Sequence, residues 1–178
     1  MDIDFFKRDI QYVLLNCFVS KIPSWHIRRF FYRLCGMSIH KTARIGINTI
    51  IVSPKGIKIG KRSVVNSNCF IDGSGKVLIG KDVSISAFTK IFSCTHKTDS
   101  EIFEYTTNPV VINDNVWIGA GSIILDDSII DEFSVIGAGC CFKGITEKGY
   151  IYYGNPAKKI KKRKLKRRYA IDFNPHFR

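Results

Sequence analysis

The chain has 178 residues, the size of one ordinary domain with a continuous core. Its formal net charge is +13, and charged residues interrupt the longest apolar stretches near the N-terminus, which argues against a membrane span and against a secretory signal peptide. The six cysteines show no CxxC pair and no zinc spacing, so we expect reduced core cysteines and a cytoplasmic protein.

Residues 1–38 show helical rather than shorter periodicity. Apolar residues at helical spacing predict a first amphipathic helix, and a second is expected after Pro23, with Ser24 as its N-cap and an end near Gly36. These two helices would cap the open end of the domain that follows. Binding to a membrane surface stays open as an alternative, because aromatic residues lie beside basic ones, namely Trp25, Phe30, Phe31 and Tyr32 beside Lys21, Arg28, Arg29 and Arg33.

Residues 39–157 repeat with a period of six, most regularly in INDNVW, IGAGSI, ILDDSI, IDEFSV and IGAGCC. A large aliphatic residue opens each repeat, and a small or slim residue follows four positions later. This period fits neither a helix nor a flat strand but is typical of a short strand followed by a corner. Three such faces complete one coil, and coil starts recur every twenty residues at Ile39, Ile59 and Ile79. The pattern predicts an all-β solenoid, a triangular parallel β-helix.

Glycines directly follow a repeat aliphatic in several coils. A missing Cβ at these positions is expected to ease a tight bend or to allow a positive φ, and the positions concerned are Gly46, Gly60, Gly80, Gly119 and Gly137.

The repeat breaks after Ile91 and resumes only at Ile112, which predicts an extruded loop over residues 97–110. A long loop in a solenoid whose other corners are short is more often functional than not. His96 lies where this loop leaves the regular repeat. An imidazole with a pKa near 7 can accept a proton from a hydroxyl group. The other three histidines have no comparable setting, and a lone histidine is more often structural.

The segment VVINDNVWIGAGS, with a later IGAG and a closing YGNPAKKI, resembles the hexapeptide-repeat acyltransferases. Over about residues 39–160 the chain is similar to sugar and polysaccharide O-acetyltransferases, near the maltose and galactoside acetyltransferases. The resemblance implies left-handed coils, a homotrimer, acetyl-CoA bound between adjacent prisms, no metal, and direct acyl transfer with His96 as the general base.

On the acceptor side, the resemblance implies that Asn68 holds a sugar hydroxyl near His96, whereas a corner asparagine in the αL conformation is an equally good interpretation. Asp72 would likewise contact the acceptor or merely turn the chain.

On the donor side, Trp117 would lie near the thiol end of acetyl-CoA, or would pack against the loop. Ala120 and Ala138 match positions where a small side chain lets pantetheine approach the backbone. Lys143 and Lys158 would meet the donor's phosphates as point charges. Lys143 departs from the family pattern, since it occupies a slot where relatives carry threonine.

Residues 158–178 begin with KKIKKRKLKRR and predict a basic C-terminal helix or tail. This segment would be a solvated helix, or would make peripheral contact with anionic lipid at the inner face of the membrane. Nucleic-acid binding is not favoured, because no recognition module accompanies the basic run.

The sequence therefore predicts an acetyl-CoA-dependent O-acetyltransferase that modifies a sugar in bacterial surface polysaccharide synthesis, whether O-antigen, capsule or exopolysaccharide. An N-acyltransferase of a nucleotide-linked amino sugar is the nearer alternative, and a non-catalytic trimeric scaffold is the further one. A zinc enzyme of the carbonic anhydrase kind is not favoured, because it would need three histidine ligands.

Overall fold

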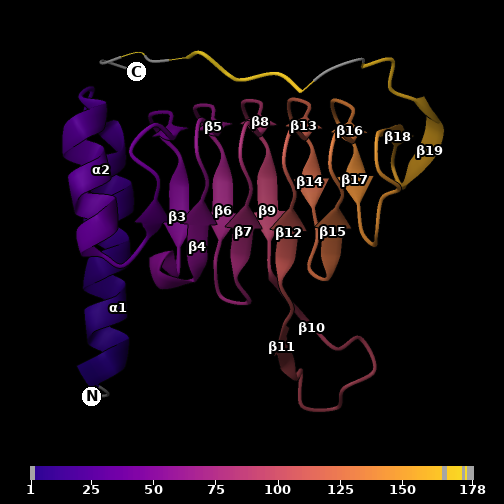
Figure 1. Cartoon of the computed structure of the whole chain (residues 1–178). Helices are drawn as coiled ribbons and strands as arrows, with labels where there is room; N and C mark the ends of the chain where they lie inside the picture. The colour runs from indigo at the N-terminus through magenta and orange to yellow at the C-terminus, as the bar shows by residue number, and fades with distance from the viewer. Residues whose placement is uncertain (1–2, 166–167, 174, 176–178) are drawn as a thin grey trace.

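The computed structural model describes residues 3–165, 168–173 and 175. Its body is a three-sided parallel β-helix with helices at its N-terminal end (Figure 1). Helix α1 (Ile3–Val13) continues through a π-helical turn, η1 (Leu14–Phe18), and a 3-10 turn, η2 (Val19–Lys21), to helix α2 (Trp25–Leu34). The fold class predicted from the six-residue period is thereby confirmed.

Three parallel sheets form the sides of the prism. The first side contains β1 (Ser38–Ile39), β4 (Ile57–Ile59), β7 (Val77–Ile79), β12 (Val110–Ile112) and β15 (Ser128–Ile130). The second side contains β2 (Arg44–Ile45), β5 (Val64–Val65), β8 (Ser84–Ile85), β13 (Trp117–Ile118), β16 (Val135–Ile136) and β18 (Tyr150–Gly154). The third side contains β3 (Ile50–Val52), β6 (Phe70–Asp72), β9 (Lys90–Phe92), β14 (Ile123–Ile124) and β17 (Cys141–Phe142). We call the corners between them edge 1–2, edge 2–3 and edge 3–1.

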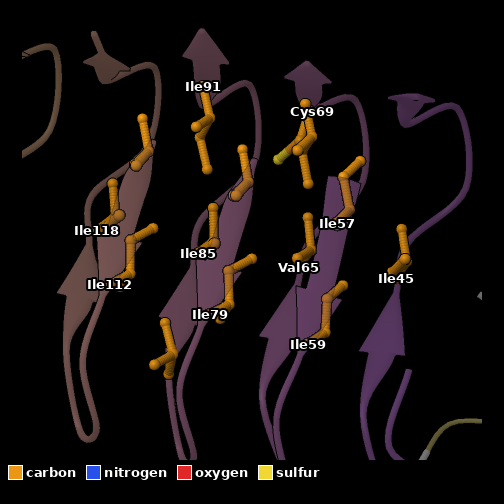
Figure 2. Packing of buried hydrophobic residues seen from close by; sticks show 14 of the residues in the cluster. Ile45, Ile57, Ile59, Val65, Cys69, Ile79, Ile85, Ile91, Ile112 and Ile118 are labelled. Atoms are coloured by element: carbon orange, nitrogen blue, oxygen red, sulfur yellow. The ribbon is translucent and has the colours of Figure 1, made fainter. Parts of the chain in front are cut away.

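The core consists of ladders of apolar residues, mostly isoleucine, from successive coils (Figure 2). On the first side, Ile39 pairs with Ile59, Ile59 with Ile79, and Ile79 with Ile112. Every repeat aliphatic identified in the sequence is buried, and so are the small residues four positions later, from Val116 to Thr146. Burying one such isoleucine contributes about 1.5–3 kcal/mol relative to leaving it exposed, so the ladders dominate the stability of the prism.

The repeat glycines serve close packing between coils rather than unusual dihedral angles. None of the five glycines that follow a repeat aliphatic has a positive φ, so that part of the expectation is wrong. A Cβ on Gly119 would lie 2.4 Å from the nitrogen of Ala138, and one on Gly60 would lie 2.4 Å from the oxygen of Gly80. The positive φ occurs two residues later, as at Arg62 and Asp82. Only glycine therefore lets the next coil approach this closely.

Helix α2 covers the end of the first coil through its inner face. Trp25, Arg28 and Tyr32 are fully buried there. The Arg28 guanidinium donates to the carbonyl oxygens of Ile22, Pro23 and Ile45, the last at 2.9 Å. The predicted membrane surface is therefore wrong for these three residues. Ser24 has the extended backbone of an N-cap, but within the described part of the chain its side chain makes no capping hydrogen bond.

The extruded loop is an ordered hairpin. Strand β10 (Cys94–His96) pairs antiparallel with β11 (Tyr105–Thr107), and the hairpin projects from edge 3–1 below the prism in Figure 1. Of the predicted loop, residues 97–104 form the tip, and Val110 already belongs to the first side.

The predicted basic C-terminal helix is wrong within the described residues. Residues 157–162 instead form strand β19 (Ala157–Lys162), which pairs antiparallel with β18. The main-chain groups of β18 would otherwise form an open sheet edge, which β19 covers. The chain then returns along edge 1–2, where Arg163 donates to the oxygens of Asn115 and Phe133 at 3.1 Å. Residues 166–167, 174 and 176–178 of this predicted segment lie outside the described residues.

Two further expectations concern cysteines and membrane spans. The six cysteines are free, and of these only Cys69 and Cys140 are buried. Among the helices that the structure describes, none has the length and apolar character needed to cross a bilayer.

Candidate active site

His96 lies half-buried at the end of β10, where its ring is held on three sides. Its Nδ1 lies 2.9 Å from the carbonyl oxygen of Phe103. The ring stacks on Phe103, with centroids 3.7 Å apart, and meets the edge of Tyr105 at 5.4 Å. Since a carbonyl oxygen only accepts hydrogen bonds, Nδ1 carries the proton in the neutral ring and Nε2 keeps its lone pair. The hairpin thus presents His96 in the tautomer that a general base needs.

Asp72 fastens the hairpin to the prism. Its Oδ1 accepts from the Ser74 amide at 2.8 Å and from the Ser74 hydroxyl at 2.6 Å, and its Oδ2 accepts from the Cys94 thiol at 2.9 Å. Burial, together with the bond to Asp72, raises the pKa of Cys94. Tyr105 also bonds Cys94 and Ser74, and burial raises its pKa. Both carboxylate oxygens of Asp72, which was predicted to contact the sugar acceptor, therefore already accept hydrogen bonds within the chain. They lie next to the start of β10, the strand that ends in His96.

Asn68 lies away from Asp72 and the base of the hairpin, at the other end of the third side. It is exposed on edge 2–3 with φ 60°, the left-handed conformation that the corner interpretation required. Its amide donates to the Ile47 oxygen at 3.1 Å. One chain thus places Asp72 beside the His96 hairpin and Asn68 about 12–15 Å from Asp72, counted as four extended residues along β6.

Edge 2–3 also carries residues that were predicted to bind acetyl-CoA. Ala120 and Ala138 are exposed there in successive coils, and the Gly139 amide donates to the Ala120 oxygen at 2.9 Å. Trp117 precedes them on β13, is 46% exposed, and donates from Nε1 to the Ser86 hydroxyl at 3.1 Å. Ala87 continues the same ladder, since its oxygen accepts from Gly121 at 3.0 Å. The sequence analysis missed Ala87, although its place after Ile85 matches that of Ala120 after Ile118.

The two predicted phosphate contacts lie on different edges. Lys158 pairs across β18–β19 with Tyr153, whose ring covers Gly137 next to Ala138, so Lys158 belongs to edge 2–3. Lys143 lies on edge 3–1, where its Nζ is 2.8 Å from Oδ1 of the buried Asp126.

Asp126 joins the last full coil to the exit of the hairpin. Its Oδ2 accepts from Asn108 at 2.9 Å, just beyond β11, while its Oδ1 faces Lys143. Burial alone would raise the pKa of Asp126, but the bonds from Lys143 and Asn108 outweigh it and hold this pKa below its ordinary value. Lys143 therefore already has a carboxylate partner.

The candidate residues thus fall into two groups. His96, Asp72 and Lys143 lie at edge 3–1, whereas Asn68, Trp117, Ala120, Ala138 and Lys158 lie at or next to edge 2–3. The third side separates the two edges, and its width of five to six extended residues corresponds to about 15–20 Å. Among the described residues no cluster of three or more metal-binding side chains occurs.

Comparison with known sequences identifies the repeat. Residues 109–144 match the family model described as bacterial transferase hexapeptide (six repeats). A putative acetyltransferase from Schizosaccharomyces pombe is 34% identical over 110 residues, which is 60% of this chain and 53% of that protein. The chain therefore spans about half the length of the curated relatives it matches.

Comparison with solved structures extends the likeness to nearly the whole chain. A maltose O-acetyltransferase from Clostridium difficile superposes with a TM-score of 0.82 at 25% identity, over 93% of this chain and 90% of that one. A hexapeptide-repeat acetyltransferase from Vibrio cholerae, solved with acetyl coenzyme A, shares the fold with a TM-score of 0.82 at 24% identity, over 92% and 91%. The resemblance to hexapeptide-repeat acetyltransferases is confirmed.

Proposed function

We propose that this hexapeptide-repeat β-helix is an acetyl-CoA-dependent O-acetyltransferase that esterifies a sugar hydroxyl in bacterial surface polysaccharide synthesis. The observation that carries the proposal is the setting of His96, whose Nδ1 is anchored by the Phe103 oxygen while Nε2 keeps its lone pair. The hairpin that carries it interrupts a repeat shared with named acetyltransferases. An acetyl-CoA donor fits a cytoplasmic reaction.

In the proposed reaction, Nε2 of His96 removes the proton of the acceptor hydroxyl as its oxygen attacks the thioester carbonyl. A backbone amide stabilises the tetrahedral oxyanion. The intermediate collapses by breaking the bond from carbon to sulfur, and the imidazolium returns its proton to the departing CoA thiolate. The products are an acetyl ester and free CoA, with no metal involved.

The donor would lie along edge 2–3. Small side chains at Ala120 and Ala138 leave backbone amides accessible to pantetheine, Trp117 flanks them, and the exposed Lys158 supplies a positive charge for phosphate. Lys143 fits this role less well, because it is paired with Asp126 on the other edge.

The acceptor would lie between His96 and Asn68. We assign hydroxyl contact to Asn68, whose exposed side chain is at edge 2–3. We assign Asp72 a positioning role, because both of its oxygens already accept bonds within the chain.

A homotrimer would bring the two groups of residues together. Acyl transfer needs the reacting atoms about 3–3.5 Å apart, whereas one chain separates its two edges by about 15–20 Å. If edge 3–1 of one copy faces edge 2–3 of the next, a closed ring of three copies holds three complete sites.

The test is CoA release from acetyl-CoA with free, nucleotide-linked and lipid-linked sugars. His96→Ala should lower kcat by roughly 10²- to 10⁴-fold while donor binding is unchanged. His40→Ala, which removes a histidine from edge 1–2, is the matched control and should keep wild-type turnover. A His96→Ala variant as active as wild type on a genuine acceptor would contradict the assignment.

Product chemistry separates the alternatives. An acetyl ester is lost in mild alkali, whereas the amide made by an N-acyltransferase survives. Absence of both acetyl-CoA binding and turnover would favour the scaffold interpretation.

A further inference from the structure

The side of α2 that faces away from the prism is apolar as well as basic. We define the α2 outer face as His26, Ile27, Arg29, Phe30, Arg33 and Leu34. Ile27, Phe30 and Leu34 are 46%, 64% and 70% exposed, at the spacing that places them on one stripe of a helix. The other members of the face, His26, Arg29 and Arg33, line a shallow hollow of about 420 Å³ together with Phe30 and Leu34.

This stripe lies opposite the buried inner face of the same helix. Trp25 and Tyr32 point into the prism cap, so α2 carries large apolar residues on both sides. An apolar stripe on a helix is normally buried against a neighbouring surface. Single exposed apolar residues are common, but a contiguous stripe with a basic rim marks an interaction surface. We infer that a partner covers the outer face.

The charge of α2 and the first coils is of one sign, although α1 at the same end carries Asp4 and Asp9. From residue 10 to residue 71 the sequence contains ten Lys or Arg and no Asp or Glu. These residues form α2 and the first coils, and only Arg28 and Arg44 among the ten are buried. Burial, followed by the charges of Lys61, Lys41, Arg29 and Arg62, lowers the pKa of His40 beside α2. The partner must therefore be anionic.

We propose that the α2 outer face docks on an anionic lipid bilayer. A second copy placed on the same face would bring Arg29 and Arg33 of both molecules together, and α2 itself carries no carboxylate to compensate them. A nucleic acid would match the charge but would leave the apolar stripe in water. An anionic bilayer accommodates both, because Phe30, Ile27 and Leu34 enter the headgroup and acyl boundary while the arginines meet lipid phosphates.

The position of α2 suits this role. The helix lies across one end of the prism, and the hairpin projects sideways from a middle coil (Figure 1). A bilayer against the outer face therefore leaves edges 2–3 and 3–1 uncovered. In the proposed trimer of parallel prisms, three such faces would lie on the same side and would bind with avidity.

Vesicle flotation of the full-length protein tests the proposal. Wild type should bind vesicles of phosphatidylcholine mixed with phosphatidylglycerol and should not bind phosphatidylcholine alone. Arg33→Glu, and separately the double variant Phe30→Ser with Leu34→Ser, should each lower the partition coefficient at least about tenfold. Lys164→Glu is the matched control, since it makes the same charge change in the exposed basic tail, and should lower binding by less than about twofold.

Four results would overturn the proposal. They are no vesicle binding by wild type, an equal loss in Lys164→Glu and Arg33→Glu, full binding by the Phe30→Ser, Leu34→Ser variant, and self-association of wild type that this variant abolishes. The third would indicate a general polyanion site and the fourth a second copy. Matched thermal unfolding midpoints confirm that the variants are folded. The assay contains neither acetyl-CoA nor acceptor, so its outcome is independent of the proposed reaction.

Discussion

At the scale of single residues, Asp72 is the clearest link between the prism and His96. Its carboxylate binds Ser74 on one side and the Cys94 thiol on the other, two residues before His96. Asp72→Asn replaces one carboxylate oxygen by an NH2 group that cannot accept a hydrogen bond, so the start of β10 loses one of its bonds to the prism. Because small displacements of a catalytic group cost up to about 10²-fold in rate, we expect kcat to fall about 10- to 100-fold.

Measuring kcat and the KM for acetyl-CoA separately checks this positioning role. The KM for acetyl-CoA should stay at the wild-type value, because the donor edge is unchanged. Asp127→Asn, at an exposed position on the same edge with φ 60°, is the matched control and should keep wild-type kcat. Loss of acetyl-CoA affinity in Asp72→Asn would show general unfolding of the site instead.

The ion pair between Lys143 and Asp126 supplies a pH-dependent part of the stability. The folded-state pKa of Asp126 lies below its ordinary 3.8, so the pair stabilises the fold above that pH, and this contribution is lost as the pH falls through the lower folded-state pKa. Lys143→Met leaves Asp126 buried without its cation. We expect a loss of about 1–2 kcal/mol at pH 7, a modest value because Lys143 is half exposed.

Urea unfolding of wild type and Lys143→Met at several pH values measures this contribution. The difference in unfolding free energy should shrink as the pH falls below 3.8. Lys148→Met, which breaks the exposed pair with Glu132, should cost less than about 0.5 kcal/mol at any pH. A difference for Lys143→Met that is constant with pH would contradict the assignment.

At the scale of elements, the hairpin tip serves the site and not the fold. Its hydrogen bonds are internal to residues 96–104, including those from Lys97 to Glu104 and from Ser100 to Lys97. Replacing residues 97–104 by Asn-Gly should close β10 and β11 with a two-residue turn. The unfolding midpoint should stay near that of wild type, while kcat falls at least about 10²-fold, because His96 loses the Phe103 oxygen and ring.

Circular dichroism melting and CoA release measured on the same preparation test both halves of this expectation. A variant that melts early would show that the tip supports the prism. A variant that keeps its rate would show that His96 does not need Phe103.

Elements with local periodicity could be predicted from the sequence, and those set by distant pairing could not. The large and small residues of each face were readable because burial recurs every six positions. The lysine-rich sequence of β19 predicts a helix, because lysine has good helix propensity and only the distant β18 gives this segment a strand partner. The period does imply different corners for His96, after the third face, and Ala120, after the second, but it gives no sign of the bonds by which Asp72 holds Cys94 and Ser74.

At the scale of the whole molecule, helix α1 and the β10–β11 hairpin both project beyond edge 3–1. Asn16 bonds both backbone groups of Ile51 on β3, and the Ser20 oxygen accepts from Asn48 near edge 2–3, so α1, which precedes them, points past edge 3–1. The hairpin leaves the prism at that same edge, as Figure 1 shows. Exposed Phe5, Phe6 and Ile10 on α1 extend the apolar surface there. A neighbouring copy packed against edge 3–1 would cover the exposed apolar residues of α1 and would also contact His96.

Mixing two inactive variants tests whether sites form between copies. His96→Ala disables edge 3–1, and Ala120→Trp fills the proposed pantetheine path on edge 2–3, so each variant alone should be inactive. If each site uses edge 3–1 of one copy and edge 2–3 of the next, a random 1:1 mixture has an intact pair at about a quarter of its interfaces. Co-refolded mixtures should therefore recover about a quarter of wild-type turnover. A site contained in one chain would recover none, because every chain in the mixture carries one of the two lesions.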